Sequence, residues 1–259
     1  MDAAKDAAVD PLELLRHGDL ELEGRLTDAS NATLRAYITL DGETARCVYK
    51  PVAGERPLWD FPDGTLAGRE VAAYLVSEAT GWECVPPTVL RDGPFGPGSC
   101  QLWIEEVAPP LVDFVPELPA GWHPIASARG GVLGHADEPG LAKLAAYDAV
   151  INNADRKGGH LLRAAGGHVY GIDHGICFHA EDKLRTVLWG WAGQELPGEV
   201  TGVLQLLRTG LTGDLGTELA RHLTPAEVQA AASRVERLLA SGRYPLPSEE
   251  WPPLPWPAL

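Results

Sequence analysis

The sequence has little positive charge and no long apolar run, and each shortage excludes a class of protein. Its 259 residues include 21 lysines and arginines against 36 aspartates and glutamates, for a formal net charge of −15. Such a charge opposes binding to nucleic acid or to an anionic membrane surface. No stretch approaches the roughly eighteen apolar residues of a membrane-spanning helix. We therefore expect no nucleic-acid partner and no integral membrane association.

Cysteine is also scarce. Its four positions, Cys47, Cys84, Cys100 and Cys177, are scattered and form no Cys-x-x-Cys pair. This indicates neither a structural zinc site nor a disulfide framework, and we expect buried apolar thiols in a reducing compartment. The first residues, MDAAKDAAVDPLELLRHGD, carry acids and lack the apolar core of a signal peptide. A cytoplasmic location is the expectation.

The first part of the chain predicts a strand-rich unit with one main helix. Asp10 and Pro11 begin a short helix that ends at His17. Helical spacing over residues 65–80 ends at Gly81. Asp41 is followed by glycine, a strong hairpin signal between two strands. The alternation of apolar and polar side chains predicts strands at 20–26, 34–40, 45–49, 88–91 and 101–106, with a Gly/Pro-rich turn over 92–99.

The second part predicts mainly helices. Prolines 109, 110, 116 and 119 indicate a loop-rich stretch and a lobe boundary near residue 108. Helices are expected at 140–151, 202–209 and 225–241, the last with a capping box from Thr224 and Glu227. The Pro- and Trp-rich tail, 242–259, is expected to pack on the domain rather than to serve as a polyproline ligand. The prediction is an α+β fold with an N-lobe at 1–107 and a C-lobe at 108–259.

Two acidic residues, Asp155 and Asp173, lie eighteen residues apart, each in a polar turn. Phosphoryl transfer from ATP needs one carboxylate facing the acceptor hydroxyl and another holding Mg²⁺ against the phosphates. We assign the first role to Asp155 and the second to Asp173, although Asn, Asp and Gly are also ordinary turn residues. Arg156 would brace the loop or neutralise phosphate charge, and His160 would be a second metal contact.

Other candidates lie in the N-lobe. Lys50 ends a strand and could project its ammonium toward phosphates, while Glu70, on the following helix, could pair with it. By themselves they read as an edge lysine and a solvated helix glutamate. Ser30 and Asn31 lie between two strands and could let backbone amides approach phosphates, or simply form a turn. Backbone groups near the lobe boundary, at Glu105, Glu106 and Val107, could contact adenine.

Together these segments resemble the phosphatidylinositol 3- and 4-kinase superfamily, nearest to the type II phosphatidylinositol 4-kinases and their small bacterial relatives, and distantly HipA-type kinases. The resemblance covers about residues 30–194 and rests on Lys50, Glu70 in EVAAY, DRKGGH from Asp155 and IDHGICF around Asp173, with WGWAGQ after the metal loop. It implies a two-lobed protein-kinase-like fold. It also implies that Lys50 contacts ATP phosphates, Glu70 pairs with it, residues 105–107 form the hinge, Asp155 is catalytic and Asp173 binds Mg²⁺.

The sequence departs from that pattern at His160, where the superfamily has asparagine as a metal ligand. Imidazole is a poorer ligand for Mg²⁺ than an amide oxygen, because hard cations prefer oxygen ligands. We therefore expect either a preference for Mn²⁺ or weakened catalysis. The cysteine-rich palmitoylated insertion of the type II lipid kinases has no counterpart, which favours a protein or small polar acceptor over a bilayer lipid. The function predicted is transfer of the γ-phosphoryl group of ATP to a hydroxyl. The alternatives are AMP transfer on the same fold and a nucleotide-binding sensor with little turnover.

Overall fold

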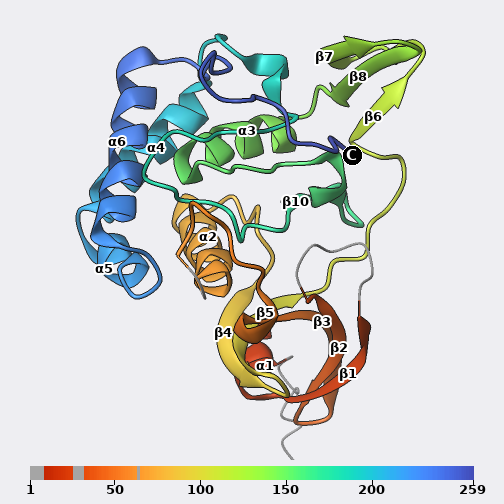
Figure 1. Ribbon diagram of the computed structural model, residues 1–259, viewed down its shortest axis with the longest axis vertical. Coiled ribbons are helices and arrows are strands. Elements are labelled where there is room, and N and C mark those ends of the chain that lie inside the picture. The colour runs from red at the N-terminus through yellow and green to blue at the C-terminus, as the bar shows by residue number, and fades with distance from the viewer. Residues whose placement is uncertain (1–8, 26–31, 63–64) are drawn as a thin grey trace, which may run out of the picture.

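The computed structural model describes residues 9–25, 32–62 and 65–259. Its N-terminal part is a five-stranded antiparallel sheet in the order β1-β2-β3-β5-β4, with α1 (Pro11–His17) packed on it (Figure 1). The strands are β1 (Asp19–Arg25), β2 (Leu34–Leu40), β3 (Glu43–Pro51), β4 (Thr88–Gly93) and β5 (Gly96–Leu102). The expected helix and the first four expected strands are therefore present, with ends that differ little from the prediction. The fifth strand was expected at 101–106 and shares only residues 101–102 with β5.

A separate small core holds this sheet to α1. Leu14 and Leu15 of α1 pack with Ile38, Cys47 and Cys100 from the sheet, and all five side chains are buried. Buried residues alternate with more exposed ones around Ile38 in β2, whereas Cys100 lies in a run of four buried residues in β5. The four cysteines of the chain are free and buried, as expected.

The tight turns lie where small or flexible residues allow them. Asp41 and Gly42 join β2 to β3 with φ of +50° and +84°, the left-handed region that Asp and Gly adopt most readily. β4 and β5 join over two residues, because Gly93 pairs with Gly96. The expected turn over 92–99 is thus wrong in extent, since most of its glycines and prolines lie in strands.

Helix α2 (Leu66–Thr80) lies between the sheet and the helical part of the molecule (Figure 1). It ends at Gly81, which has a φ of +65°. Most of its side chains are buried, and it contacts β4 and β5 on one side and α4 and α5 on the other. Its buried charged residues, Arg69 and Glu70, are therefore held between the two parts of the chain.

The C-terminal part packs four helices around the larger core: α3 (Pro139–Ile151), α4 (Gly198–Leu211), α5 (Asp214–Leu219) and α6 (Pro225–Ser241). Thr224 and Glu227 form the expected capping box at the start of α6. A hairpin of β9 (Leu161–Arg163) and β10 (Val169–Gly171) separates the two acidic turns. Short 3₁₀ helices are η1 (Val52–Gly54), η2 (Gly158–His160) and η3 (Trp189–Trp191).

The loop-rich stretch predicted after residue 108 is instead a three-stranded antiparallel sheet in the order β6-β8-β7. Its strands are β6 (Val112–Val115), β7 (Trp122–Ala128) and β8 (Gly131–Ala136). Prolines 110 and 116 flank β6, and Pro124 lies where the register of β7 shifts. Proline is compatible with a strand at its ends or at such an irregularity. The number of prolines was therefore not evidence against strands in this stretch, and the loop-rich prediction was wrong.

The tail packs on the domain, as expected, although Trp256 is 91% exposed and only Tyr244 among its three aromatic residues is buried. It runs from α6 back across α3 toward the end marked C (Figure 1). The Pro253 carbonyl accepts hydrogen bonds from the Thr186 amide and the Trp189 indole, each at 3.0 Å. The Gly158 amide donates to Ala258 at 2.8 Å. The tail is thus attached to the loop that carries the first acidic turn.

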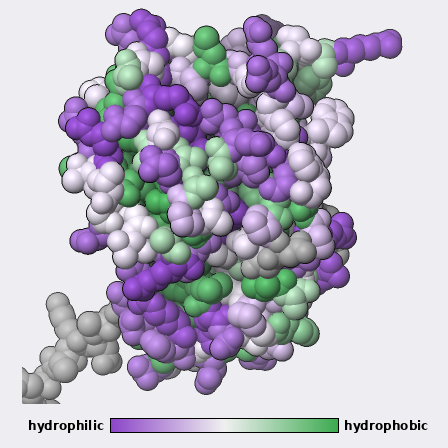
Figure 2. All heavy atoms as spheres, turned by 60° about the vertical axis from the view of Figure 1, so that its left-hand side comes forward, coloured by the Kyte–Doolittle hydropathy of each residue, from purple (hydrophilic) through white to green (hydrophobic). Residues whose placement is uncertain are grey.

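On the face shown in Figure 2, apolar side chains form separate patches among polar ones. No helix within the described ranges is long and apolar enough to cross a membrane.

Candidate functional site

Lys50, Glu70 and Asp173 come from three distant segments and meet beside one cavity. Lys50 lies near the end of β3, and its Nζ atom ion-pairs with the Glu70 carboxylate on α2. The same Nζ atom lies 2.8 Å from Oδ1 of Asp173, in the turn after β10. The structure thus brings together a lysine and two acids that we selected from the sequence.

Their mutual attraction keeps Lys50 and Asp173 ionised. Burial lowers the pKa of Lys50, but Asp173 and Glu70 outweigh it, so the pKa lies above its ordinary value. The Lys50 ammonium holds the pKa of Asp173 well below its usual range, against the opposing effect of burial. The Asp173 side chain remains half exposed, whereas Glu70 is 3% exposed. Asp173 is therefore the acid that a ligand can reach.

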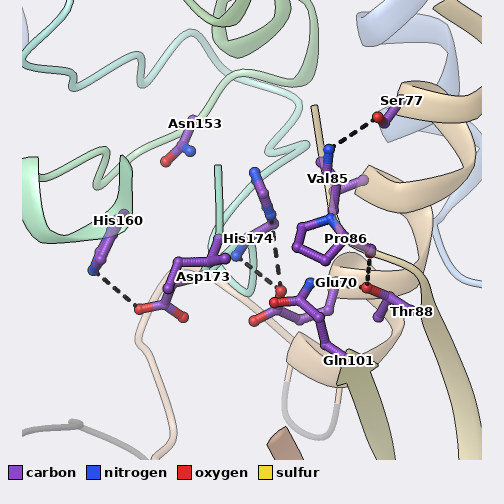
Figure 3. A network of polar contacts seen from close by, with 12 residues as sticks. Glu70, Ser77, Val85, Pro86, Thr88, Gln101, Asn153, His160, Asp173 and His174 are labelled. Carbon is purple, nitrogen blue, oxygen red and sulfur yellow. Dashed lines mark hydrogen bonds and ion pairs between the residues drawn. The ribbon is translucent and has the colours of Figure 1, made fainter. Parts of the chain in front are cut away.

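Glu70 also fixes the backbone of the second acidic turn. Its other oxygen accepts a hydrogen bond from the His174 amide at 2.9 Å (Figure 3). Asp173 has a φ of +59°, the left-handed conformation that aspartate adopts more readily than most other residues with a side chain. Positive φ values outside glycine are uncommon and recur at functional positions.

His160 approaches Asp173 from the other side. Its Nε2 atom lies 3.3 Å from Oδ2 of Asp173 (Figure 3). Burial lowers the pKa of His160 to about 4, against the attraction of Asp173, so the imidazole is neutral at neutral pH. A neutral imidazole is the form that binds a metal ion. In the described part of the chain, no group of three or more His, Cys, Asp or Glu side chains is arranged to hold a metal.

Asp155 lies in the polar turn after α3. Asn152 ends that helix with a φ of +54°, and the side-chain oxygen of Asn153 accepts from the Asp155 amide at 3.0 Å. The Asp155 carboxylate is 21% exposed and lies 2.9 Å from Nζ of Lys157. Burial raises its pKa, while Lys157 opposes that shift. Residues 152–160, which we call the acceptor loop, thus present one carboxylate that solvent reaches.

Arg156 is fully buried and cannot reach a bound phosphate. It forms two hydrogen bonds of 2.9 Å with Asp148 on α3. A further nitrogen donates to the carbonyls of Ile172 at 2.7 Å and His160 at 3.3 Å. Of the two roles that the sequence left open, only bracing fits this geometry, which ties the acceptor loop to the turn of Asp173.

Asp148 was missed by the sequence argument. It lies within the apolar helix α3 with no exposed surface, and it also accepts from the Asn153 side chain at 3.1 Å. An acid inside an apolar helix is the signal that could have found it, because such a group is rarely buried without a partner.

Glu55 was missed as well. Its carboxylate accepts from the amides of Leu66 at 3.2 Å and Ala67 at 2.8 Å, at the start of α2. It lines the cavity of Lys50 with Ala32, Thr33, Glu70, Asp173 and Gly175. Ser30 and Asn31, expected to approach phosphates, lie outside the described residues. Their described neighbours, Ala32 and Thr33, lie on the cavity wall.

The expected hinge residues have other contacts. β5 ends at Leu102 rather than Glu106, so residues 105–107 follow the strand. The Glu105 carboxylate lies 2.9 Å from Arg46, and the Val107 amide donates to the Arg163 carbonyl at 2.8 Å. Glu106 is exposed. The Val107 amide is thus already satisfied, so an adenine ring in this region would need other backbone groups.

No protein-family model matches the sequence. Over 262 aligned residues the chain is 46% identical to Protein Rv2133c of Mycobacterium tuberculosis (strain ATCC 25618 / H37Rv), with 95% of this chain and 94% of the relative covered.

Two solved structures have a similar fold. One is the Golgi casein kinase with Mn/ADP bound, with a TM-score of 0.55 and 14% identity over 89% of this chain and 74% of that one. Another is hydra Fam20 with sugar, with a TM-score of 0.56 and 17% identity over 88% and 86% of the two chains. These likenesses confirm the α+β kinase-like fold. They do not confirm the narrower resemblance to phosphatidylinositol kinases.

Proposed function

The chain belongs to the same family as Protein Rv2133c of Mycobacterium tuberculosis, and we propose that it is an ATP-dependent phosphotransferase that moves the γ-phosphoryl group to a hydroxyl. The observation that carries this proposal is the contact of Lys50 with both Glu70 and Asp173 at one cavity. A kinase-like fold supplies the setting, with the proposed N-lobe at 1–107 and C-lobe at 108–259. The proposed cofactors are ATP and Mg²⁺ or Mn²⁺.

Lys50 is the proposed phosphate contact. Its ammonium is positioned by Glu70, whose second oxygen is bound to the His174 amide. When phosphate oxygens enter the cavity, Lys50 can exchange its contact with Asp173 for one with phosphate while Glu70 keeps it in place. This exchange leaves the Asp173 carboxylate available for a cation.

Asp173 and His160 are the residues that would hold a divalent cation. These two side chains provide part of the ligand set that a divalent cation needs, because the carboxylate of Asp173 and the neutral imidazole of His160 face each other. The cation would supply charge neutralisation at the phosphates. An imidazole nitrogen suits Mn²⁺ better than Mg²⁺, so we propose Mn²⁺ as the preferred ion.

Asp155 is the proposed catalytic residue on the acceptor side. It would orient the acceptor hydroxyl and take its proton late in the transfer. Burial raises the pKa of Asp155, which makes it a better base than a free aspartate, while Lys157 keeps it ionised. Arg156 and Asp148 hold the acceptor loop so that this carboxylate faces solvent. We propose a protein or small polar molecule as the acceptor.

A nucleotide sensor is the second candidate, and His160 favours it. With histidine in place of an amide, the site has only one carboxylate and one imidazole for a cation. Weak cation binding would permit nucleotide binding with little transfer.

Incubation of the protein with ATP labelled at the γ position, with Mg²⁺ or Mn²⁺, tests the proposal. A kinase places label on an acceptor or releases it as phosphate, and Asp173→Asn abolishes the reaction. The matched control is Asp19→Asn, at an exposed position on β1. An AMP-transferase would instead release pyrophosphate, and a sensor would bind ATP without consuming it. Equal label transfer by wild type and Asp173→Asn would contradict the proposed site.

A further inference from the structure

A second cavity of about 340 Å³ lies on the C-terminal part, away from Lys50. Its walls come from the end of α6, the end of α3, residues 182–189 and the tail. Asn152, the first residue of the acceptor loop, is one of the lining residues. The volume is in the range of pockets that hold small molecules, which begin near 300 Å³.

The charge of this cavity is opposite to that of the whole protein. Its charged lining residues are Arg234, Arg237, Arg243 and one acid, Asp182. The chain as a whole carries −15. Three guanidinium groups around one cavity in such a chain produce a local positive field that attracts anions.

Arg234 is a buried cation that forms no ion pair with a carboxylate of the described residues. Its side chain is 5% exposed, Nε donates to the Val150 carbonyl at 2.9 Å, and Nη1 donates to the His179 carbonyl at 3.2 Å. Nη2 has no hydrogen-bond partner among the described residues. Burial lowers the pKa of Arg234 to about 10, against the attraction of Asp182. A buried charge of this kind is costly until an anion or further hydrogen bonds satisfy it.

The two other arginines can adapt to a ligand. Arg237 holds both oxygens of Asp182 at 2.9 Å, and Arg243 donates to the Gly193 carbonyl at 2.8 Å and to Glu195 at 3.1 Å. Both side chains are more than half exposed. Exposed ion pairs contribute little stability, so exchange for a ligand anion costs little.

The uncharged part of the wall is mainly apolar, with Asn152, Ser241 and Ser248 as its polar residues. Leu184, Trp189 and Leu246 line the cavity, and Leu246 is 71% exposed although it is a large apolar side chain. Cationic and apolar groups thus meet in a single cavity. That combination matches a ligand with an anionic head and an apolar body.

We propose that this cavity binds an organic anion, a phosphate or carboxylate attached to an apolar ring or chain. The head lies against Arg234 and Arg237, whose guanidinium groups match the oxygens of either head group. The apolar body packs on Leu184 and Trp189. The site is separate from the nucleotide cavity, and the proposal does not depend on the kinase activity.

The test is calorimetric titration of the full chain with 1-naphthyl phosphate, 1-naphthoate and 1-naphthol at constant ionic strength. We expect one saturable site for at least one of the two anions and at least tenfold weaker binding of the neutral naphthol. The stronger of the two anions identifies the preferred head group. Arg237→Gln and Arg243→Gln should each weaken binding roughly fivefold, since each removes a charged hydrogen-bond donor. Arg208→Gln, on exposed α4 outside the cavity, is the matched control and should bind as wild type.

Arg234→Gln should abolish binding, but its burial makes folding of that variant uncertain. Ser241→Trp fills the cavity from an exposed position and should also abolish binding. Asp173→Asn should bind normally, because its site is elsewhere. The proposal is overturned if neither anion binds saturably, if naphthol binds equally well, if the arginine and Ser241 variants bind as wild type, or if Asp173→Asn alone loses binding.

Discussion

The Nζ atom of Lys50 lies 2.8 Å from Oδ1 of Asp173, although 123 residues separate them in the chain. The first residue comes from the N-terminal sheet and the second from the turn after β10. This contact joins the two parts of the molecule at the cavity where we propose that nucleotide binds. Lys50 also ion-pairs with Glu70, so the Glu70 carboxylate helps to fix the position of the Lys50 ammonium in this contact.

Glu70→Gln removes the charge that positions Lys50. The amide can still accept from the His174 backbone, so the fold is kept, but Lys50 is drawn toward Asp173. We expect the Kd for ATP to rise roughly tenfold, as for loss of one charge-assisted contact. Fluorescence titration with a labelled nucleotide measures this, with the exposed helix variant Glu78→Gln as control. An unchanged Kd would contradict the positioning role of Glu70.

Asp155→Asn removes the proposed base but preserves its shape. Turnover should fall by a factor on the order of 10² to 10⁴, the usual contribution of such a group. ATP binding should be unchanged, because Asp155 belongs to the acceptor loop and does not line the cavity of Lys50. Steady-state kinetics and a separate binding titration distinguish the two effects. Normal turnover in this variant would remove Asp155 from the mechanism.

His160→Asn places an oxygen ligand opposite Asp173. Because Mg²⁺ prefers oxygen over nitrogen, the ratio of Mg²⁺-supported to Mn²⁺-supported turnover should rise several-fold. His168→Asn, at an exposed position in the β9–β10 hairpin, is the matched control. A ratio that stays the same in both variants would argue against a metal contact at His160.

Asp148→Asn breaks a fully buried ion pair. It leaves the Arg156 guanidinium without a counterion, and the loss of unfolding free energy should be about 3–5 kcal/mol. Urea denaturation measures this. The double variant Asp148→Leu with Arg156→Met should lose less than the sum of the single variants, because neither buried charge then remains. Glu218→Gln, in an exposed pair with Arg221, should change stability by no more than about 0.5 kcal/mol.

His135 makes stability depend on pH. Burial lowers its pKa to about 4 from an ordinary 6.5, with the hydrogen bond to the Ala136 carbonyl opposing that shift, and His123 and Asp137 are its titratable neighbours. The neutral ring accepts from the Gly190 amide at 3.1 Å. Between about pH 6.5 and pH 4, His135 binds a proton in the unfolded chain more readily than in the folded one. The contribution of neutral His135 to the free energy of unfolding is therefore complete above about pH 6.5 and declines as the pH falls toward 4.

Urea denaturation at pH 7.5 and pH 5 tests whether the free energy of unfolding falls with pH. The acid-induced loss should be smaller in His135→Gln than in wild type, by up to about 2 kcal/mol. His17→Gln, on the exposed face of α1, should match wild type. A gain in stability of the wild-type protein on acidification would contradict the role assigned to neutral His135.

Local patterns predicted much of the fold. Helix ends at Gly81 and at the Thr224 cap follow from backbone conformation and capping, which neighbouring residues determine. The sheet β6-β8-β7 was missed because its prolines lie at the flanks of β6 and at the register shift in β7. Proline excludes a regular central strand, but pairing across strands decides whether such an irregularity is allowed.

The candidate site, like the fold, was predicted only in part from the sequence. Lys50, Glu70 and Asp173 could be selected because their order along the chain suits phosphoryl transfer. The buried pair of Asp148 with Arg156 and the cap that Glu55 provides for α2 could not, because they depend on contacts between distant segments. The sequence likewise gave no sign that the Val107 amide is bound to Arg163.

Calorimetric titration with ATP and Mn²⁺ into wild type and Lys50→Met is the most direct test of the nucleotide site. The account predicts saturable, metal-dependent binding to wild type and affinity at least roughly tenfold lower in the variant. Lys143→Met, whose lysine ion-pairs with Glu199 on α4, should bind as wild type. No binding to wild type, or equal affinity in wild type and Lys50→Met, would contradict the central claim.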